Sequence, residues 1–289
     1  MSGVGRNQLE LIADSLSTRD WSILSFLSRF RYATTAQLRR VHFTGHLTET
    51  AATRACIRVL DRLLAHRLVT RLERRIGGIR RGSAGFVWHL DVAGERLTRP
   101  EPSGRRRYED PSHAFLDHAL DVTEAAVTLH ELTLASDLTL TELEVEPAAW
   151  RSYLSAAGTR AILKPDLFAT VSSTDYDDHW YIEIDRGTES LPVLLAKSRA
   201  YAAYRRTGRA QAEHGVFPRV LWVLPTQRRL DRLQAALRAD PDLPDRLFAA
   251  ITPEQLTATI RDQPDSLPLP APTPATHTPP EPKEEEAHS

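Results

Sequence analysis

The fold of this chain is decided by two short stretches, LKPDLFATV at residues 163–171 and WYIEID at residues 180–185. Each is an apolar run typical of a strand, and a polar segment that predicts a turn separates them. Two strands paired across that turn bring Asp166 close to Glu183 and Asp185. Carboxylates at neighbouring strand ends are the usual oxygen ligands of a hard divalent cation. The sequence therefore predicts that these three carboxylates lie together at one end of a sheet.

The second stretch also predicts which way its side chains point. Side chains alternate along a strand, so Glu183 and Asp185 share one face while Ile182 and Ile184 turn into the core. We expect the two acids to face a cleft. A bound Mg²⁺ or Mn²⁺ would activate water there and neutralise a phosphodiester transition state. The candidate metal ligands are Asp166, Glu183, Asp185 and, as an outer ligand on the preceding helix, Glu124.

A helix predicted from Leu191 to Arg206 adds a cation to this site. Its Lys197, or alternatively Arg186, is placed to stabilise developing negative charge. The candidate catalytic residues are Asp166, Glu183, Asp185 and Lys197. A structural alternative is that Asp185 to Glu189 form a helix-capping turn with a local ion pair. No nucleotide-binding fingerprint is present, so we expect no organic cofactor.

The charge of the chain is divided unequally between its two halves. Residues 1–110 hold 20 arginines and 11 acidic residues, a net charge of +9, whereas residues 111–289 hold 17 basic and 27 acidic residues, a net charge of −10. Arginine outnumbers lysine throughout, as expected of a GC-rich coding bias, but that bias does not explain the split. A basic N-terminal half indicates a polyanionic partner, because Arg and Lys contacts to phosphates supply most non-specific binding energy.

The N-terminal half shows the element order of a winged helix-turn-helix. Apolar spacing predicts a helix from Thr18 or Asp20 to Phe30, a short one capped by Thr34 or Thr35, and a third from about residue 48 to residue 67. Strands at residues 68–72 and 86–90 then flank a glycine-rich loop. Three helices followed by a two-stranded wing are typical of DNA-binding modules, although such modules also mediate protein contacts.

The predicted DNA contacts lie on the third helix and the wing. That helix presents Thr50, Thr53, Arg54 and Arg58 outward, and the wing loop carries four more arginines. Helix arginines are also common on purely solvated faces. The candidate DNA-binding residues are Arg54, Arg58, Arg74, Arg75, Arg80 and Arg81. Double-stranded DNA is the expected partner.

The remaining segments complete a two-domain α+β organisation. We expect a flexible N-terminus at residues 1–17, the winged helix at residues 18–99, a linker at residues 100–111 and an α/β domain at residues 112–261. The predicted element order in that domain is α-β-β-β-α-β-α-β, with a polar loop between its first two strands. A proline- and glutamate-rich tail at residues 262–289 is expected to be disordered.

Several functional classes are disfavoured by composition. The longest apolar runs are far too short to span a bilayer, and residues 1–17 lack the apolar core of a secretion signal, so we expect a cytoplasmic protein without membrane contact. The single cysteine, Cys56, lies in an apolar helical pattern and offers neither a disulfide nor a zinc motif. Oligomeric state is not indicated by the sequence.

Two resemblances follow from these motifs. The order of elements and the pattern Pro165-Asp166, Glu183-x-Asp185 and Lys197 resemble the PD-(D/E)xK nuclease superfamily, which implies a restriction-endonuclease-like core. That superfamily has a lysine where Asp185 stands. Either Lys197 supplies its function from the helix or catalysis has been lost.

A closer resemblance, over residues 18–252, is to the replication-relaxation family. It is carried by RFRYATTAQL (29–38), RIGG (75–78), LKPD (163–166), YIEIDRGTES (181–190) and FPRVLWV (217–223). The resemblance implies a protein of plasmids or integrative elements that acts in replication, DNA relaxation or mobilisation, together with replication or mobilisation proteins. Its C-terminal domain is then a metal-dependent nuclease or nickase. Alternatively, the chain is a non-catalytic DNA-binding regulator whose degenerate nuclease-fold domain binds a protein partner.

Overall fold

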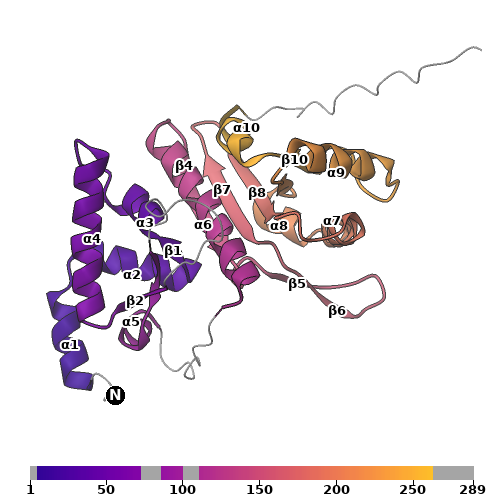
Figure 1. Cartoon of the computed structure of the whole chain (residues 1–289). Coiled ribbons are helices and arrows are strands. Elements are labelled where there is room, and N and C mark those ends of the chain that lie inside the picture. Colours follow the sequence, from indigo (N-terminus) through magenta and orange to yellow (C-terminus); the bar gives the residue numbers. More distant parts are fainter. Residues whose placement is uncertain (1–4, 73–85, 100–110, 263–289) are drawn as a thin grey trace, which may run out of the picture.

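The computed structural model describes residues 5–72, 86–99 and 111–262. Within these ranges the chain is a mixed α+β protein, as predicted. Figure 1 shows an N-terminal group of helices with a small sheet, a larger sheet covered by helices, and the long helix α6 (His113–Leu134) between them.

The N-terminal region has the three helices and two strands that the sequence predicts, together with two helices and one short strand that it did not predict. Its three-stranded sheet is antiparallel and has the order β1-β3-β2. The elements are α1 (Arg6–Ser15), α2 (Thr18–Phe30), β1 (Ala33–Thr34), α3 (Thr35–His42), α4 (Glu49–Ala65), β2 (Val69–Leu72), β3 (Val87–Leu90) and α5 (Val92–Thr98). Fully buried leucines of α2, α3 and α4 fill the core between the helices and the sheet.

Side-chain caps fix where these helices begin. Thr34 accepts from the backbone N–H of Gln37, and the Gln37 side chain accepts from the Thr34 N–H, which confirms Thr34 as a cap. Helix α2 begins with the same kind of capping box, but its cap is Ser17, paired with Asp20. The prediction of Thr18 or Asp20 as that cap was therefore wrong by one position or more.

The predicted flexible N-terminus is corrected by α1. Its Leu9 and Ile12, three residues apart on one face, are buried in the same core as α2. This segment was overlooked because only these two side chains anchor a short helix, and a stripe of two apolar residues is a weak periodic signal. Helix α5 was missed for a similar reason.

The C-terminal region is built on a five-stranded sheet with the order β10-β9-β8-β7-β4. Strands β4, β7 and β8 are antiparallel neighbours, and β8, β9 and β10 run parallel. The elements are β4 (Thr139–Val145), β5 (Arg151–Leu154), β6 (Arg160–Leu163), β7 (Leu167–Ser172), β8 (Asp177–Ile184), α7 (Leu191–Arg206), α8 (Arg209–His214), β9 (Arg219–Val223), α9 (Gln227–Ala239), β10 (Phe248–Ile251), a 3₁₀ turn η1 (Pro253–Gln255) and α10 (Leu256–Asp262).

Each face of this sheet has its own core. Trp180 and Ile182 pack with α6 and α10 on one face, whereas Tyr181 and Trp222 pack with α7, α8 and α9 on the other. The alternation predicted for β8 is thereby confirmed for Ile182. The order of the predicted strands and helices is also confirmed, and Figure 1 shows the two helical layers on opposite sides of the sheet.

The polar loop predicted after β4 is instead the antiparallel hairpin β5-β6. Tyr153 and Leu163 are buried, while Ser152, Leu154 and Ile162 are exposed. Four-residue strands with only one buried side chain each give too short an alternation to be recognised in the sequence. Helices α8 and α10 were likewise not predicted.

Helix α6 packs on both regions. Phe30 of α2 joins the core formed by α6 and the sheet, and Tyr32 and Val87 pack with Leu116 and Leu120 of α6. The hydroxyl of Thr123 donates to the backbone carbonyl of Tyr32 at 3.0 Å. The N-terminal region is therefore mounted directly on α6.

Some predictions fall outside the described residues. The linker between Arg99 and Pro111, the tail after Asp262 and the wing loop with Arg74, Arg75, Arg80 and Arg81 all lie there. Among the helices that the structure does describe, none combines the length and apolar character needed to cross a bilayer.

Candidate functional site

The strand register brings two of the predicted acids together. Leu167 of β7 pairs with Ile182 of β8, so Asp166, just before β7, lies beside Glu183. The backbone N–H of Ile184 donates to Asp166 Oδ2 at 2.8 Å and fixes that carboxylate. Helix α7 lies over this face of the sheet and contributes Lys197.

Five side chains form what we call the carboxylate cluster: His118, Asp166, Glu183, Lys197 and Tyr201. Lys197 Nζ lies 2.5 Å from Glu183 Oε2 and 3.9 Å from Asp166 Oδ1. The Tyr201 hydroxyl donates to Glu183 Oε1, and His118 Nε2 lies 3.4 Å from Asp166 Oδ1. The cluster thus links α6, β7, β8 and α7.

Burial and mutual charge shift the pKa values within the cluster. Burial raises the pKa of Glu183 to about 8, against the opposing effect of Lys197. Burial would lower the pKa of Lys197, but the charges of Glu183 and Asp166 outweigh it and raise that pKa to about 12. The cluster therefore pairs a cationic lysine with a glutamate whose pKa is raised by burial.

The histidine and aspartate of the cluster form a second coupled pair. The hydrogen bond to Asp166 raises the pKa of His118. Burial would raise the pKa of Asp166, but His118 and Lys197 outweigh it and lower that pKa. Asp166 is thus stabilised in its anionic form by its contacts with His118 and Lys197.

Asp185 and Glu124 do not join the cluster. Asp185 is held by Arg229 of α9, whose Nη2 donates to Asp185 Oδ1 at 2.8 Å. The same oxygen accepts from the Gly187 N–H at 3.1 Å and closes a local turn. That turn does not cap α7, whose N-cap is Ser190, and the ion pair is with the distant Arg229, so the structural alternative is wrong in both respects. Glu124 accepts from Gln37 at 3.0 Å and pairs with Arg40.

The expectation of an open cleft beside Glu183 was wrong. Glu183 has an exposed fraction of 0%, because α7 covers the face of β8 that also carries Tyr181. Glu183 and Asp185 do leave β8 on the same side, but Asp185 turns to α9 and Glu183 to α7.

The arrangement does not fit the predicted four-carboxylate site for Mg²⁺ or Mn²⁺. Among the residues that the structure describes, no three or more His, Cys, Asp or Glu side chains are grouped so that they could hold a metal ion. The two acids that do meet, Asp166 and Glu183, already face Lys197, Tyr201, His118 and a backbone N–H. The geometry is that of an internally neutralised ion network.

Sequence reasoning did not place His118 or Tyr201 in this network. Tyr201 follows Lys197 by four residues, so its position on the same helical face was a usable signal. His118 lies on a different element, far upstream of Asp166, and no spacing rule connects them. Only the packing of α6 against the sheet brings them together.

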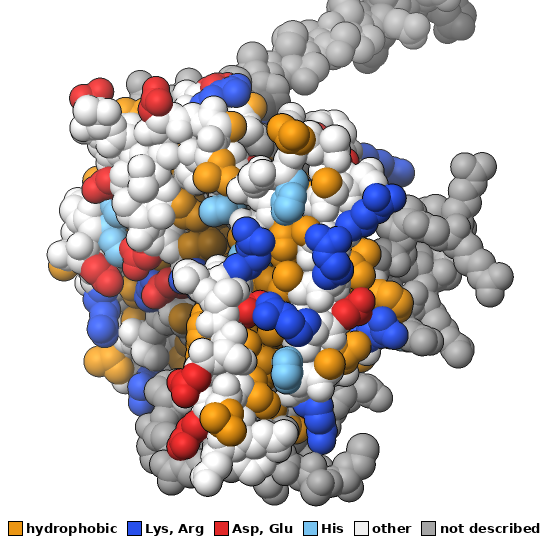
Figure 2. Space-filling view, turned by 90° about the vertical axis from the view of Figure 1, so that its left-hand side faces the viewer, with side chains coloured by type: hydrophobic (Ala, Val, Ile, Leu, Met, Phe, Trp, Pro, Cys, Tyr) orange, Lys and Arg blue, Asp and Glu red, His pale blue; other side chains and the backbone are white. Residues whose placement is uncertain are grey.

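A second candidate site is the outer face of α4. Thr50, Arg54 and Arg58 are exposed there, as predicted, whereas Thr53 is half-buried. Within the described ranges neither Arg54 nor Arg58 has an ion-pair partner. Figure 2 shows the side of the molecule on which α4 lies, and Lys and Arg side chains gather near the middle of that side. The strands beside α4 add Arg71, stacked 4.3 Å from the centre of the Phe86 ring.

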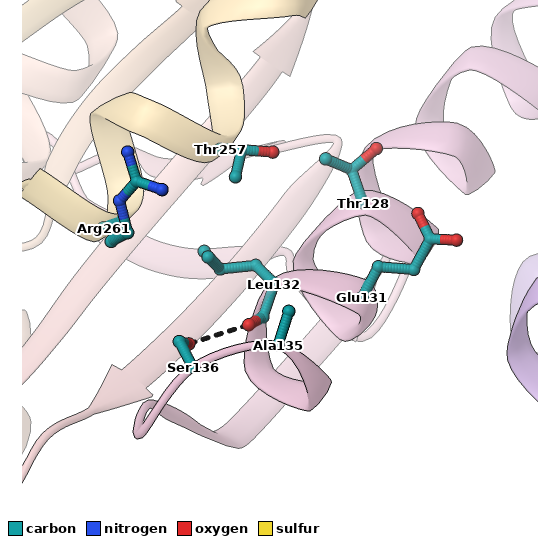
Figure 3. Close-up of a pocket in the computed structure, with 7 residues that line it drawn as sticks. All are labelled: Thr128, Glu131, Leu132, Ala135, Ser136, Thr257 and Arg261. Atoms are coloured by element: carbon teal, nitrogen blue, oxygen red, sulfur yellow. Dashed lines mark hydrogen bonds between the residues drawn. The ribbon is translucent and has the colours of Figure 1, made fainter. Parts of the chain in front are cut away.

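A pocket of about 250 Å³ lies between the end of α6 and α10. Figure 3 shows Leu132 and Ala135 on its floor and polar side chains at its rim, with the Ser136 hydroxyl donating to the Leu132 carbonyl. None of the cluster residues lines it. Its rim charges, Glu131 and Arg261, are paired with Arg40 and Asp262.

Comparison with known proteins gives one match. The family model described as Replication-relaxation matches residues 24–220, more than half of the chain. The matched range runs from α2 to β9 and so includes α4 and every member of the carboxylate cluster. No curated protein and no solved structure gives a significant match.

Proposed function

Because this chain belongs to the replication-relaxation family, we propose that it is a DNA-binding protein acting in a replication-related process of a plasmid or integrative element. The observation that carries the proposal is the outer face of α4, where Arg54 and Arg58 are exposed without acidic partners among the described residues. Such arginines are suited to phosphate and groove contacts.

The N-terminal region supports this as a winged helix. Its helices α2, α3 and α4 and its sheet order β1-β3-β2 follow the element order of that module. Helix α3 packs on α6, whereas the outer side of α4 is turned away from the large sheet (Figure 1). A duplex would therefore meet the outer side of α4 without displacing any element that the structure describes.

Fluorescence anisotropy with labelled duplex DNA tests the proposal. We expect Arg54→Ala and Arg58→Ala each to weaken binding and to reduce the slope of log affinity against log salt by about 0.9 for each phosphate that is no longer neutralised. The matched control is Arg232→Ala, which removes an exposed arginine from α9 on the other region. Equal binding by all four proteins would contradict a role for the α4 face.

Nuclease activity is a second candidate, supported by the meeting of Asp166, Glu183 and Lys197. It needs a rearrangement in which Lys197 releases Glu183, because the observed network leaves no site for an ion. A supercoiled-plasmid nicking assay with and without Mn²⁺ tests it. Nicking that Asp166→Asn abolishes while duplex binding persists would support the nuclease.

A regulator without cleavage activity is the competing proposal, with the C-terminal domain binding a replication or mobilisation protein. The neutralised network and the distant position of Asp185 favour it. Metal-independent duplex binding without nicking by the wild-type protein is the outcome expected of such a regulator.

A further inference from the structure

Ile57 is the exposed large apolar side chain of α4. Its exposed fraction is 42%, whereas Cys56, Leu60 and Leu63 are fully buried. A β-branched residue on the solvent side of a helix adds nothing to helix propensity. The exposed part of this side chain is therefore available for contact with a partner.

The neighbours of Ile57 define its surroundings. Arg54 precedes it by three residues and Asp61 follows it by four, so the three share the outer face, with Arg58 beside them. The two arginines have no ion-pair partner in the described part of the chain. Ile57 is thus an exposed apolar side chain flanked by Arg54 and Arg58, with the carboxylate of Asp61 one turn farther along the same face.

This pattern favours a duplex over a protein partner. A stable protein interface covers about 800 Å² per partner around an apolar centre, and one isoleucine bordered by charges does not provide such a centre. The major groove of B-form DNA combines phosphates at its edges with thymine methyl groups on its floor. Its chemistry therefore matches cations that flank a single apolar side chain.

We propose that Ile57 reads the 5-methyl group of a thymine in the major groove, with Arg54 and Arg58 holding α4 in place. The inference rests on the proposed DNA binding and adds to it a residue that determines sequence preference. It also predicts discrimination against RNA, because uracil lacks the methyl group and the A-form major groove is too deep and narrow for a helix.

The test begins with duplexes that wild-type protein selects from a random DNA library. Each thymine of a selected duplex is replaced in turn by uracil, which removes only the methyl group. We expect one or two positions to lose about 3- to 5-fold in affinity, the factor for burying one methyl group. Ile57→Ala should lower the affinity for the thymine duplex by a similar factor. Replacing the thymine with uracil should then lower the affinity of this variant no further, and a double-mutant cycle measures the coupling.

Two variants keep the result interpretable. Ile57→Val retains a branched apolar side chain and should retain the discrimination, while Val92→Ala changes an apolar residue that is 57% exposed on α5 and should behave like wild type. Binding that ignores uracil at every position, or an Ile57→Ala protein that still discriminates, would overturn the inference and leave DNA binding intact. Failure of wild type to select any duplex would overturn both proposals.

Discussion

The contact between Lys197 and Glu183 is the most consequential one at the scale of single residues. Glu183 is completely buried, and Lys197 Nζ lies 2.5 Å from its carboxylate. A buried pair of this kind adds little net stability, but removing one partner is costly because an uncompensated charge remains. The lysine therefore makes an ionised Glu183 tolerable inside the fold.

We predict that Lys197→Met destabilises the protein by about 3 kcal/mol at pH 9, the cost of breaking a buried ion pair. The loss should be smaller at pH 6. Burial raises the folded-state pKa of Glu183 to about 8, so its neutral form fits the core. An acid whose pKa is raised on folding contributes stability when the pH lies below the pKa that it has in the unfolded chain. That contribution is lost as the pH rises through the pKa that it has in the folded protein. Urea unfolding at both pH values measures the difference.

Two further variants check this explanation. Adding Glu183→Gln to Lys197→Met removes the charge that lacks a partner and should recover much of the loss at pH 9. Arg205→Met removes an exposed arginine without an ion pair in the described part of the chain from the same helix, and should cost no more than about 0.5 kcal/mol at either pH. A Lys197→Met loss independent of pH would show that Glu183 is not the titrating group.

Part of this cluster was predictable from single residues. The two apolar runs and the polar turn predicted between them correctly brought Asp166 beside Glu183, because strand pairing is set by local apolar patterns. The ion-pair partner of Asp185 was not predictable. It is Arg229, which is distant in sequence and becomes a neighbour only when α9 packs beside α7. Ion pairs between different helices and strands leave no periodic pattern in the sequence.

At the scale of elements, α3 is attached to α6 by the side chains of Arg40 and Gln37. Arg40 Nε donates to Glu131 Oε1 at 2.7 Å, and its guanidinium also pairs with Glu124. Gln37 adds a bond of 3.0 Å to the Leu120 carbonyl. The predicted metal ligand Glu124 thus serves as an anchor between two helices.

We predict that Arg40→Met lowers the free energy of unfolding by about 1 kcal/mol, because the two carboxylates it leaves are partly solvated. A double-mutant cycle with Glu131→Gln should give a positive coupling energy of at least about 0.5 kcal/mol. Arg39→Met, whose partner Glu49 is far more exposed, should show a smaller coupling. Additive effects at Arg40 and Glu131 would contradict the anchor.

Elements with long apolar stripes were predicted well, and those with few buried residues were not. Helix α6 and strands β7 to β9 were found because repeated buried positions give a clear period. Helix α1 and the β5-β6 hairpin were missed because each contributes only one or two buried side chains per segment. Whether these segments form a helix or a hairpin depends on the hydrophobic core against which they pack.

At the scale of the whole molecule, the two predicted domains share core residues. Phe30 belongs to the N-terminal helix α2 but is buried with α6 and the large sheet, and Tyr32 and Val87 pack on α6. A boundary placed from composition alone therefore separates segments that are packed together. The sequence pattern could not show this, because an apolar residue does not reveal which core it enters.

We predict that both regions unfold together in one cooperative transition. Hydrogen exchange under increasing denaturant should show amides of α2 and of β8 losing protection at the same denaturant concentration. Phe30→Ala should shift both together, by about 3 to 4 kcal/mol for a buried phenylalanine. Separate transitions for α2 and β8 would show that the shared core contributes little.

The mounting of the N-terminal region on α6 also has a geometric consequence. The hydroxyl of Thr123, the Arg40 pairs and Phe30 hold α4 at a set angle to the five-stranded sheet. A nucleic acid bound to α4 would then leave the protein in one fixed direction relative to the five-stranded sheet. An enzyme recruited by the sheet region would always approach the duplex from the same side and at the same distance along its axis.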